Sequence, residues 1–145
     1  MAVLCDTNVL LRSVQRHHPH YPAASATIER LIRANREPVI FLQNLVEFWN
    51  VATRPLENNG LGYSIERTDE ELSRLTESLT VLPDHARTSQ LWRSLVVEHR
   101  VRGVQVHDAR LVAGMKAHGI DEIVTYNRDD FSRYRDISVL LPAVS

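Results

Sequence analysis

A chain of 145 residues suits one domain with one hydrophobic core, so we expect a single domain over residues 1–145. Its 17 basic and 18 acidic residues give a net charge of -1, which excludes a basic nucleic-acid-binding field over the whole protein. Cys5 is the single cysteine, so no disulfide can form within the chain. The sequence shows neither a signal-peptide pattern nor an apolar run near the roughly 18 residues of a membrane span. We therefore expect a cytoplasmic protein without membrane contact.

Two kinds of apolar pattern alternate along the chain. Short runs rich in β-branched residues predict strands, and apolar residues at helical spacing predict helices. In chain order, the predicted strands are residues 2–5, 39–42, 79–82, 122–125 and 138–141. The predicted helices are residues 9–16, 23–35, 45–52, 64–76, 84–99 and 108–118. This alternation indicates an α/β fold with right-handed βαβ units, a mainly parallel central sheet and helices on both faces.

Three acids lie at the end of a predicted strand or near the start of a predicted helix. Asp6 ends the first strand, Glu47 falls in the first turn of the helix after the second strand, and Asp108 begins the helix 108–118. Parallel strands end on one edge of a sheet, and ligands of open α/β sheets bind at that edge. We therefore expect the three acids to converge in one crevice, joined there by polar residues of the segment 125–131.

Each acid also has a purely structural explanation. Asp6 or Asp108 could N-cap a helix, and Asn44 and Glu47 have capping-box spacing, with Glu47 reaching back to the Asn44 amide. However, Asp6 and Glu47 have apolar neighbours, and several like charges buried together are costly without a cation. Mg²⁺, with Mn²⁺ as the alternative ion, favours carboxylate and water oxygens, so a metal site explains the group better than capping alone.

Four segments resemble, in order, the motifs of PIN domains, and most closely those of the VapC toxins of bacterial and archaeal toxin–antitoxin pairs. They are Asp6-Thr7-Asn8, Glu47 within residues 45–50, His107-Asp108-Ala109, and residues 125–131. Residues 52–55 and 59–62 also resemble a VapC subgroup. The similarity spans essentially the whole chain. It implies a three-layer α/β/α sandwich, Mg²⁺-dependent ribonuclease activity, a homodimer, and inhibition by a cognate VapB-like antitoxin.

The resemblance also assigns roles to residues. Asp6 and Asp108 match the principal metal ligands of the family, and Glu47 matches the second acid, which holds a further metal or the attacking water. The fourth family acid commonly falls where this chain has Asn127, which offers a carbonyl oxygen but no charge. Asp130 is then the candidate that replaces the missing acid, or a residue that only orients the loop. The expected catalytic set is therefore Asp6, Glu47, Asp108 and Asp130.

Residues around these motifs receive supporting roles. Thr7, Asn8 and Asn127 are expected to fix the geometry of the metal ligands through hydrogen bonds. Some basic residues near the motifs either contact RNA phosphates or belong to an ordinary charged surface, and these are Arg12, Arg110 and Arg128. The histidines at positions 17, 18 and 20 are more typical of a solvated turn than of a metal site, since Pro19 breaks helical spacing. Trp49 and Trp92 are more typical of core or dimer contacts than of base stacking.

The function expected from these residues is hydrolysis of an RNA phosphodiester by a water molecule activated at the metal. Three alternatives remain open. A phosphatase of the haloacid-dehalogenase type is disfavoured because position 8 is Asn, where a second Asp would be needed two residues after Asp6. A DNA nuclease on a similar sheet is possible. The third is a non-catalytic module that binds RNA or a protein, in which the acids serve only as helix caps.

Overall fold

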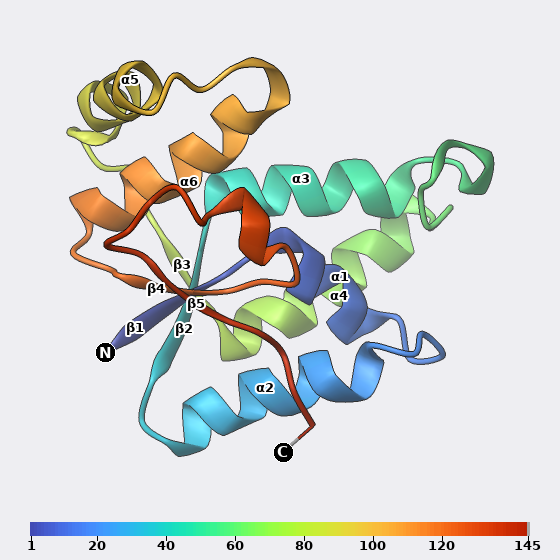
Figure 1. The fold of residues 1–145 in the computed structure, drawn as a ribbon. Coiled ribbons are helices and arrows are strands. Elements are labelled where there is room, and N and C mark those ends of the chain that lie inside the picture. The colour runs from blue at the N-terminus through green and yellow to red at the C-terminus, as the bar shows by residue number, and fades with distance from the viewer. Residues whose placement is uncertain (145) are drawn as a thin grey trace.

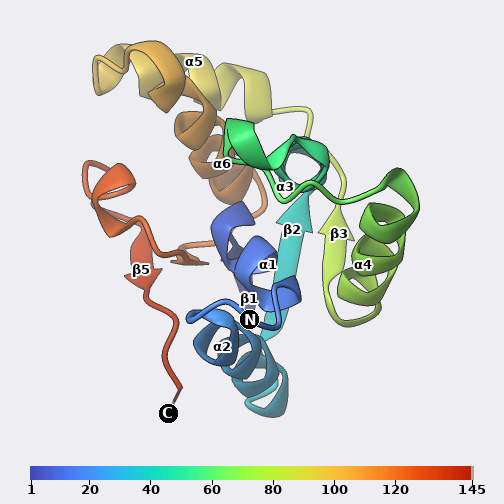
Figure 2. The ribbon, with the colours of Figure 1, turned by 90° about the vertical axis from the view of Figure 1, so that its right-hand side faces the viewer.

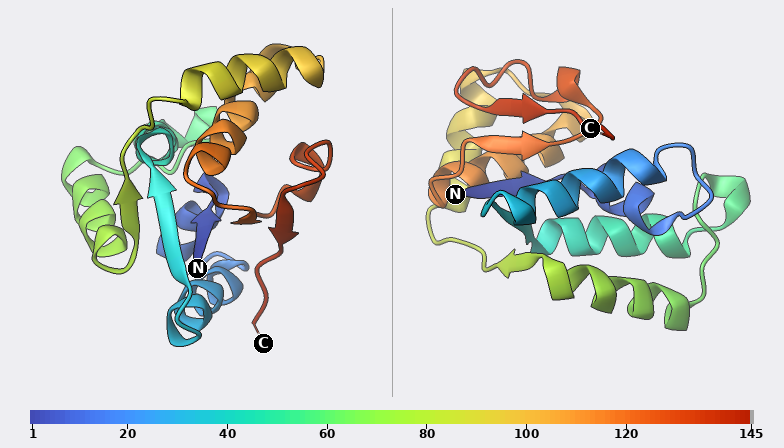
Figure 3. Two further views of the ribbon diagram at one scale, coloured as in Figure 1. Left: turned by 90° about the vertical axis from the view of Figure 1, so that its left-hand side faces the viewer. Right: turned by 90° about the horizontal axis from the view of Figure 1, so that it is seen from below.

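The structure, a computed structural model, describes residues 1–144 and builds them around one five-stranded sheet. The strands are β1 (Ala2–Cys5), β2 (Glu37–Phe41), β3 (Thr80–Leu82), β4 (Glu122–Val124) and β5 (Ser138–Leu140). Their order is β3-β2-β1-β4-β5, and every neighbouring pair is parallel. Figure 3 shows β1, β4 and β5 side by side in its right-hand panel. The predicted parallel sheet is therefore confirmed.

Helices cover both faces of the sheet and give three layers (Figures 1 and 2). They are α1 (Thr7–Val14), α2 (Tyr21–Arg33), α3 (Leu42–Thr53), α4 (Ile65–Ser78), α5 (Thr88–Glu98) and α6 (Val106–Ala117). Three short 3₁₀ turns lie between them, at Leu56–Asn58, Gly103–Gln105 and Arg128–Asp130. The first four helices pack in one core cluster and α5 and α6 in the other, so the expected α/β/α sandwich is confirmed.

The central strand β1 contributes to both cores. Val3 and Cys5 are fully buried against the side of α1 to α4, and Leu4 is fully buried against the side of α5 and α6. Alternate side chains of a strand point to opposite faces, so a strand covered on both faces has to be apolar throughout. This explains the unbroken apolar run before Asp6. Burial also raises the pKa of the Cys5 thiol to about 12, which leaves it a protonated, packed side chain.

The order of the strands places Asp6 at the point where the chain changes direction across the sheet. From β1 the chain moves outward to β2 and β3, and it then returns to the other side of β1 with β4 and β5. In open α/β sheets, ligands bind outside the carboxyl ends of the strands at such a switch point. The end of β1 therefore lies where a crevice of this fold is expected.

One predicted boundary is wrong in a way that affects the site. Leu42 begins α3 rather than ending β2, so Glu47 lies in the second turn of the helix and not in the first. The structure also excludes the alternative explanation of Asn44 and Glu47 as a capping box. Asn44 is the third residue of α3, and its Oδ1 accepts the backbone N–H of Phe41 at 2.8 Å. Asn44 thus caps the start of α3 from within its first turn. Glu47 is not needed as a cap and is free for other contacts.

Other boundaries move by a few residues. Helix α1 begins directly after Asp6, because the Asp6 carboxylate caps it. Helix α5 begins at Thr88 rather than at residue 84, and the ring Nδ1 of His85 accepts the N–H of Arg87 at 3.0 Å in a turn before the helix. Asp108 lies in the first turn of α6, which starts at Val106.

Among residues 1–144, no helix combines the length and the apolar character needed to cross a membrane.

Candidate active site

Asp6 caps α1 and also lies at the carboxyl edge of the sheet. Its Oδ1 accepts the N–H of Thr7 at 2.8 Å, and its Oδ2 accepts the hydroxyl of Thr125 at 2.7 Å. Its own N–H donates to the carbonyl of Val124 at 3.0 Å, which fixes the backbone against β4. The residue is only 7% exposed. Asp6 is therefore a rigidly held carboxylate rather than a mobile surface acid.

Thr125 connects Asp6 to the loop after β4. The Thr125 hydroxyl accepts hydrogen bonds from Asn8 Nδ2 at 3.2 Å and from the backbone N–H of Asn127 at 3.0 Å. Because two donors occupy its lone pairs, its proton points to Asp6. Asn8 also accepts the N–H of Tyr126 through Oδ1 at 3.3 Å. The predicted supporting residues Asn8 and Asn127 thus act on Asp6 chiefly by orienting Thr125.

Glu47 reaches the site from α3. The hydroxyl of Thr7 donates to Glu47 Oε1 at 2.8 Å, and Gln43 Nε2 lies 3.4 Å from Oε2. Asn44, which is fully buried, donates to the Thr7 hydroxyl at 3.1 Å and so orients it. One carboxylate oxygen of Glu47 is held firmly, while the other has only a long contact. Thr7 is placed between Asp6 and Glu47, as a supporting residue should be.

Gln43 is a site residue that the sequence reasoning missed. Its Nε2 donates to the carbonyl of His107 at 2.8 Å in addition to its contact with Glu47. It therefore ties the first turn of α6, which carries Asp108, to α3. Residues four apart lie on the same face of a helix, so the spacing of Gln43 and Glu47 was the available signal.

The electrostatics show that acids from four segments act on one another. Burial, followed by the charges of Asp130, Asp6 and Glu47, raises the pKa of the half-buried Asp108 to about 7. Burial is also the first cause that raises the pKa of Asp6 to about 6, with Glu47 and Asp130 adding to it and the hydrogen bonds from Thr125 and Thr7 opposing it. The convergence expected at this edge is therefore present, and its negative charge is poorly compensated.

Within residues 1–144, the positive charge of Arg133 opposes the rise in the pKa of Asp108. Arg133 donates to Gln105 Oε1 at 2.7 Å, which holds it beside the start of α6. The sequence carried no signal for this placement, because Arg133 lies in an irregular segment without periodicity. A single half-buried guanidinium does not neutralise four carboxylates, so the site remains suited to a further cation.

Oxygen ligands of this kind suit a hard divalent ion, although they do not already form a cage. Within the described residues, no three His, Cys, Asp or Glu side chains stand close enough together to hold a metal. Mg²⁺ commonly uses only one or two direct carboxylates and keeps several waters, so a three-residue cage is not required. Asp6 and Asp108, whose pKa values are raised first by burial and then by neighbouring carboxylates, are the side chains that fit best as direct ligands.

In the loop after β4, it is Asp130 rather than Asn127 that affects the pKa values of the carboxylates. The charge of Asp130 contributes to the raised pKa of both Asp6 and Asp108. Asn127 is exposed, and its hydrogen bonds recorded within residues 1–144 are made by its backbone: its N–H donates to the Thr125 hydroxyl, and its carbonyl accepts the N–H of Asp130 at 3.1 Å. Asp130 is therefore the residue of this loop whose charge acts on the two aspartates.

The three candidate RNA-contacting arginines have different surroundings. Arg12 lies close enough to Tyr126 and His18 to affect the pKa of each, and Arg128 is exposed in the last 3₁₀ turn. Arg110 instead lines a cavity of about 420 Å³ with Trp92 and other residues at the start of α5. Trp92 donates its indole N–H to the carbonyl of Val106 at 2.9 Å and packs on the core, as predicted.

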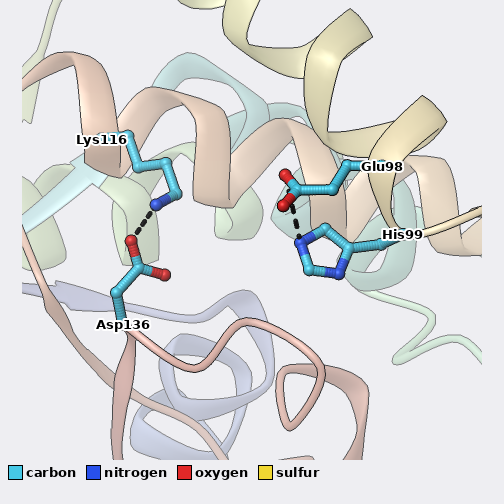
Figure 4. Close-up of polar contacts among 4 residues, drawn as sticks. All are labelled: Glu98, His99, Lys116 and Asp136. Carbon is cyan, nitrogen blue, oxygen red and sulfur yellow. Dashed lines mark hydrogen bonds and ion pairs between the residues drawn. The ribbon is translucent and has the colours of Figure 1, made fainter.

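A second polar recess, of about 750 Å³, lies where α5, α6 and the segment before β5 meet. Figure 4 shows two charge pairs within it. Lys116 donates to Asp136, and His99 Nε2 lies 3.7 Å from Glu98 Oε2. The hydrogen bond from Lys116 holds the pKa of Asp136 below its usual range. Its lining also includes Arg133 and Arg135, so this recess lacks the excess of negative charge found around Asp6.

The fold and the site together define a three-layer α/β/α domain with a group of acidic side chains at the switch point of a parallel sheet. A family model described as PIN domain matches residues 3–137. The chain therefore belongs to the PIN domain family.

Solved structures share this fold at low sequence identity. VapBC2 from Rickettsia felis, bound to a DNA fragment from its promoter, has a TM-score of 0.74 at 17% identity, covering 99% of this chain and 100% of that one. Mycobacterium tuberculosis VapC20, a sarcin–ricin-loop-cleaving toxin, has a TM-score of 0.67 at 17% identity, with 91% and 95% covered. FitAcB from Neisseria gonorrhoeae has a TM-score of 0.66 at 18% identity, with 97% and 96% covered. No curated protein sequence matches the chain.

Proposed function

We propose that this PIN domain is a Mg²⁺-dependent endoribonuclease and the toxin of a VapBC-type toxin–antitoxin pair. The observation that carries the proposal is the mutual electrostatic effect of Asp6, Glu47, Asp108 and Asp130, which come from four separate segments. Helix capping accounts for Asp6 alone, because Glu47 lies in the second turn of its helix and contacts Thr7 instead. The similarity in fold to VapC20, a toxin that cleaves the sarcin–ricin loop, supports RNA as the substrate class.

A bound divalent ion would lower the pKa of water and neutralise charge on the phosphoryl oxygens. Asp6 and Asp108 would hold the ion, with Mn²⁺ as the alternative to Mg²⁺. Thr125 keeps the Asp6 carboxylate in one orientation, and Gln43 keeps Asp108 at a fixed place relative to Glu47 by joining α6 to α3.

Glu47 is the side chain best placed to orient the attacking water and receive its proton. Thr7 holds one of its oxygens at 2.8 Å, while the other has only the long 3.4 Å contact with Gln43 and is free to accept a hydrogen bond. Asp130 adds negative charge from the loop after β4. Hydrolysis in this arrangement leaves a 5′-phosphate and a 3′-hydroxyl.

The proposed partners are a VapB-like antitoxin and a second copy of the chain. Several of the solved structures with this fold are toxin–antitoxin complexes, including one from Klebsiella pneumoniae. Leu42 and Val46, one turn apart on α3, are 49% and 60% exposed and offer apolar surface for a protein contact. Expression of the chain should arrest growth unless an antitoxin from a neighbouring gene is co-expressed.

The test is cleavage of structured and unstructured RNA by the purified protein with Mg²⁺ or with EDTA. Asp6→Asn and Asp108→Asn should abolish cleavage, and EDTA should abolish it in the wild type. Asp69→Asn, which changes an exposed acid on α4, is the matched control and should retain activity. Full activity in both Asp6→Asn and Asp108→Asn would contradict the proposal.

The same experiment separates the alternatives. RNA that is bound but never cut, with or without Mg²⁺, would indicate a non-catalytic module. Cleavage of DNA in place of RNA would indicate a DNA nuclease, and release of phosphate from a small phosphate monoester would indicate a phosphatase.

A further inference from the structure

Three rings lie in series on the surface near the acids of the site, with their planes tilted to one another, and we call them the ring ladder: His18, His20 and Tyr126. The ring centroids of His20 and Tyr126 are 4.9 Å apart with planes inclined at 36°, and those of His18 and His20 are 5.3 Å apart at 31°. These separations lie in the range of favourable aromatic pairs. The two histidines come from the loop between α1 and α2, and Tyr126 comes from the loop after β4.

Hydrogen bonds fix the ladder in place. The hydroxyl of Tyr126 donates to the carbonyl of His20 at 3.2 Å, which joins the two loops. Within the histidine loop, the N–H of His20 donates to His18 Nδ1 at 3.0 Å. Tyr126 also packs partly against the core, whereas His20 is exposed. The ladder is thus a supported surface that still presents ring area to solvent.

The ladder begins one residue from the carboxylate network. Tyr126 follows Thr125, whose hydroxyl donates to Asp6 at 2.7 Å, and the N–H of Tyr126 donates to Asn8 Oδ1. A nucleotide whose phosphodiester lies at Asp6 would therefore have Tyr126 within reach of a flanking base.

The charge around the ladder favours nucleic acid. Residues 7–28 contain no Asp or Glu, although the whole chain carries 18 acids. The same stretch holds Arg12 and Arg16 together with three histidines. The positive charge of Arg12 opposes the rise that burial causes in the pKa of Tyr126, and it adds to the fall that burial causes in the pKa of His18. Arg12 therefore lies close to both ends of the ladder.

A metal site does not explain the histidines. His18 Nδ1 is occupied by the N–H of His20, and no group of three metal-binding side chains occurs in the part of the chain that the structure describes. A solvated turn, as the sequence predicts, accounts for their exposure but not for their ordered stack on a residue bonded into the site.

We propose that the ring ladder stacks a base of single-stranded RNA next to the cleaved phosphodiester, while Arg12 binds a neighbouring phosphate. The proposal rests on the proposed ribonuclease function and adds a base-stacking surface to that site. Aromatic side chains stack splayed bases without strong sequence preference, and arginines neutralise the backbone between them.

The test uses Asp108→Asn in EDTA as the inactive parent, because this change leaves the Asp6–Thr125–Tyr126 network intact. A short RNA carrying the fluorescent base 2-aminopurine reports stacking through quenching, and anisotropy reports affinity. The parent should quench the probe. His20→Ala and Tyr126→Leu should each weaken binding about tenfold and remove most of the quenching. Tyr126→Phe, which keeps the ring but loses the bond to the His20 carbonyl, should retain most of the quenching. His85→Ala, which changes a histidine far from the ladder in sequence and on the α5 side, should behave as the parent.

The outcomes keep the two proposals apart. Absence of quenching by the parent, or equal quenching and affinity in His20→Ala and Tyr126→Leu, would overturn the ring ladder proposal. His20 is exposed, so His20→Ala decides the matter even if Tyr126→Leu folds poorly. Ladder-dependent quenching by a protein that cuts no RNA in Mg²⁺ would support the ladder and overturn the proposed nuclease function.

Discussion

Replacement of Asp6 by Asn should stabilise the metal-free protein near neutral pH, although it should destroy activity. The pKa of Asp6 is raised from 3.8 to about 6 in the folded protein. At about 1.36 kcal/mol per pKa unit, this shift means that the ionised carboxylate lowers the free energy of unfolding by about 3 kcal/mol. Asn keeps the acceptor for the Thr7 N–H but loses the one for the Thr125 hydroxyl, which costs about 1 kcal/mol. The net expectation is a gain of about 2 kcal/mol.

The sign of this effect depends on pH. The folded protein holds the Asp6 proton more tightly than the unfolded chain, so the stabilising contribution of protonation is complete below about pH 4 and is lost as the pH rises through about 6. The advantage of Asp6→Asn should therefore appear between these values and level off above about pH 7. Below about pH 4 the wild type should be slightly more stable, because its neutral carboxyl still bonds Thr125.

Urea unfolding of both proteins in EDTA, across this pH range, measures the difference. In excess Mg²⁺ the order should reverse, because an ion that binds the folded wild type adds to its free energy of unfolding. An Asp6→Asn variant that is no more stable than the wild type at about pH 8 in EDTA would refute the reasoning that burial and neighbouring charges make this carboxylate costly.

Three further changes test the parts of the site separately. Thr125→Val should raise the pKa of Asp6 above about 6, since it removes a hydrogen bond to the ionised form, and an NMR titration of the carboxyl carbon in EDTA checks this. Gln43→Ala should lower the cleavage rate about tenfold while costing about 1 kcal/mol of stability, because it unties α3 from α6; an unchanged rate would show that Glu47 is positioned without it. Asn127→Asp should strengthen Mg²⁺ binding by restoring a fourth acid at the family position, and a titration followed by melting temperature would contradict this if the two affinities were equal.

The strand ends and their acids could be predicted because their signals are local. The apolar run before Asp6 marks a strand buried on both faces, and the alternation of strands and helices indicates a parallel sheet, whose carboxyl ends share an edge. The four residues before Asp6, which predict a strand, were enough to assign Asp6 to this edge. The periodicity of the sequence does not reveal the order of the strands or the switch point at β1, and both come from the structure.

The start of α3 could not be predicted, and the reason is physical. Residues 39–42 are all apolar, so hydrophobic pattern alone does not separate the end of a strand from the first helical turn. The boundary is set by Asn44, which reaches back to the N–H of Phe41 from inside the helix. Because of that contact, Glu47 lies in the second turn, and its carboxylate belongs to the site instead of capping the helix.

Side chains from irregular segments were the least predictable. Arg133 and the ring ladder reach the site from loops whose paths depend on tertiary contacts, such as the bond between Tyr126 and the His20 carbonyl. Asp130, and not residue 127, supplies the negative charge of this loop near Asp6. Its position depends in the same way on the turn Arg128–Asp130, which no spacing rule indicates.

Sequencing of the ends of RNA treated with the wild type and with Asp6→Asn tests the central claim most directly. A metal-dependent endoribonuclease should produce internal breaks in Mg²⁺ that carry 5′-phosphate and 3′-hydroxyl ends, and these breaks should be absent with EDTA and with Asp6→Asn. Breaks of the same kind and number with Asp6→Asn, or ends bearing a 2′,3′-cyclic phosphate, would contradict hydrolysis at this carboxylate site.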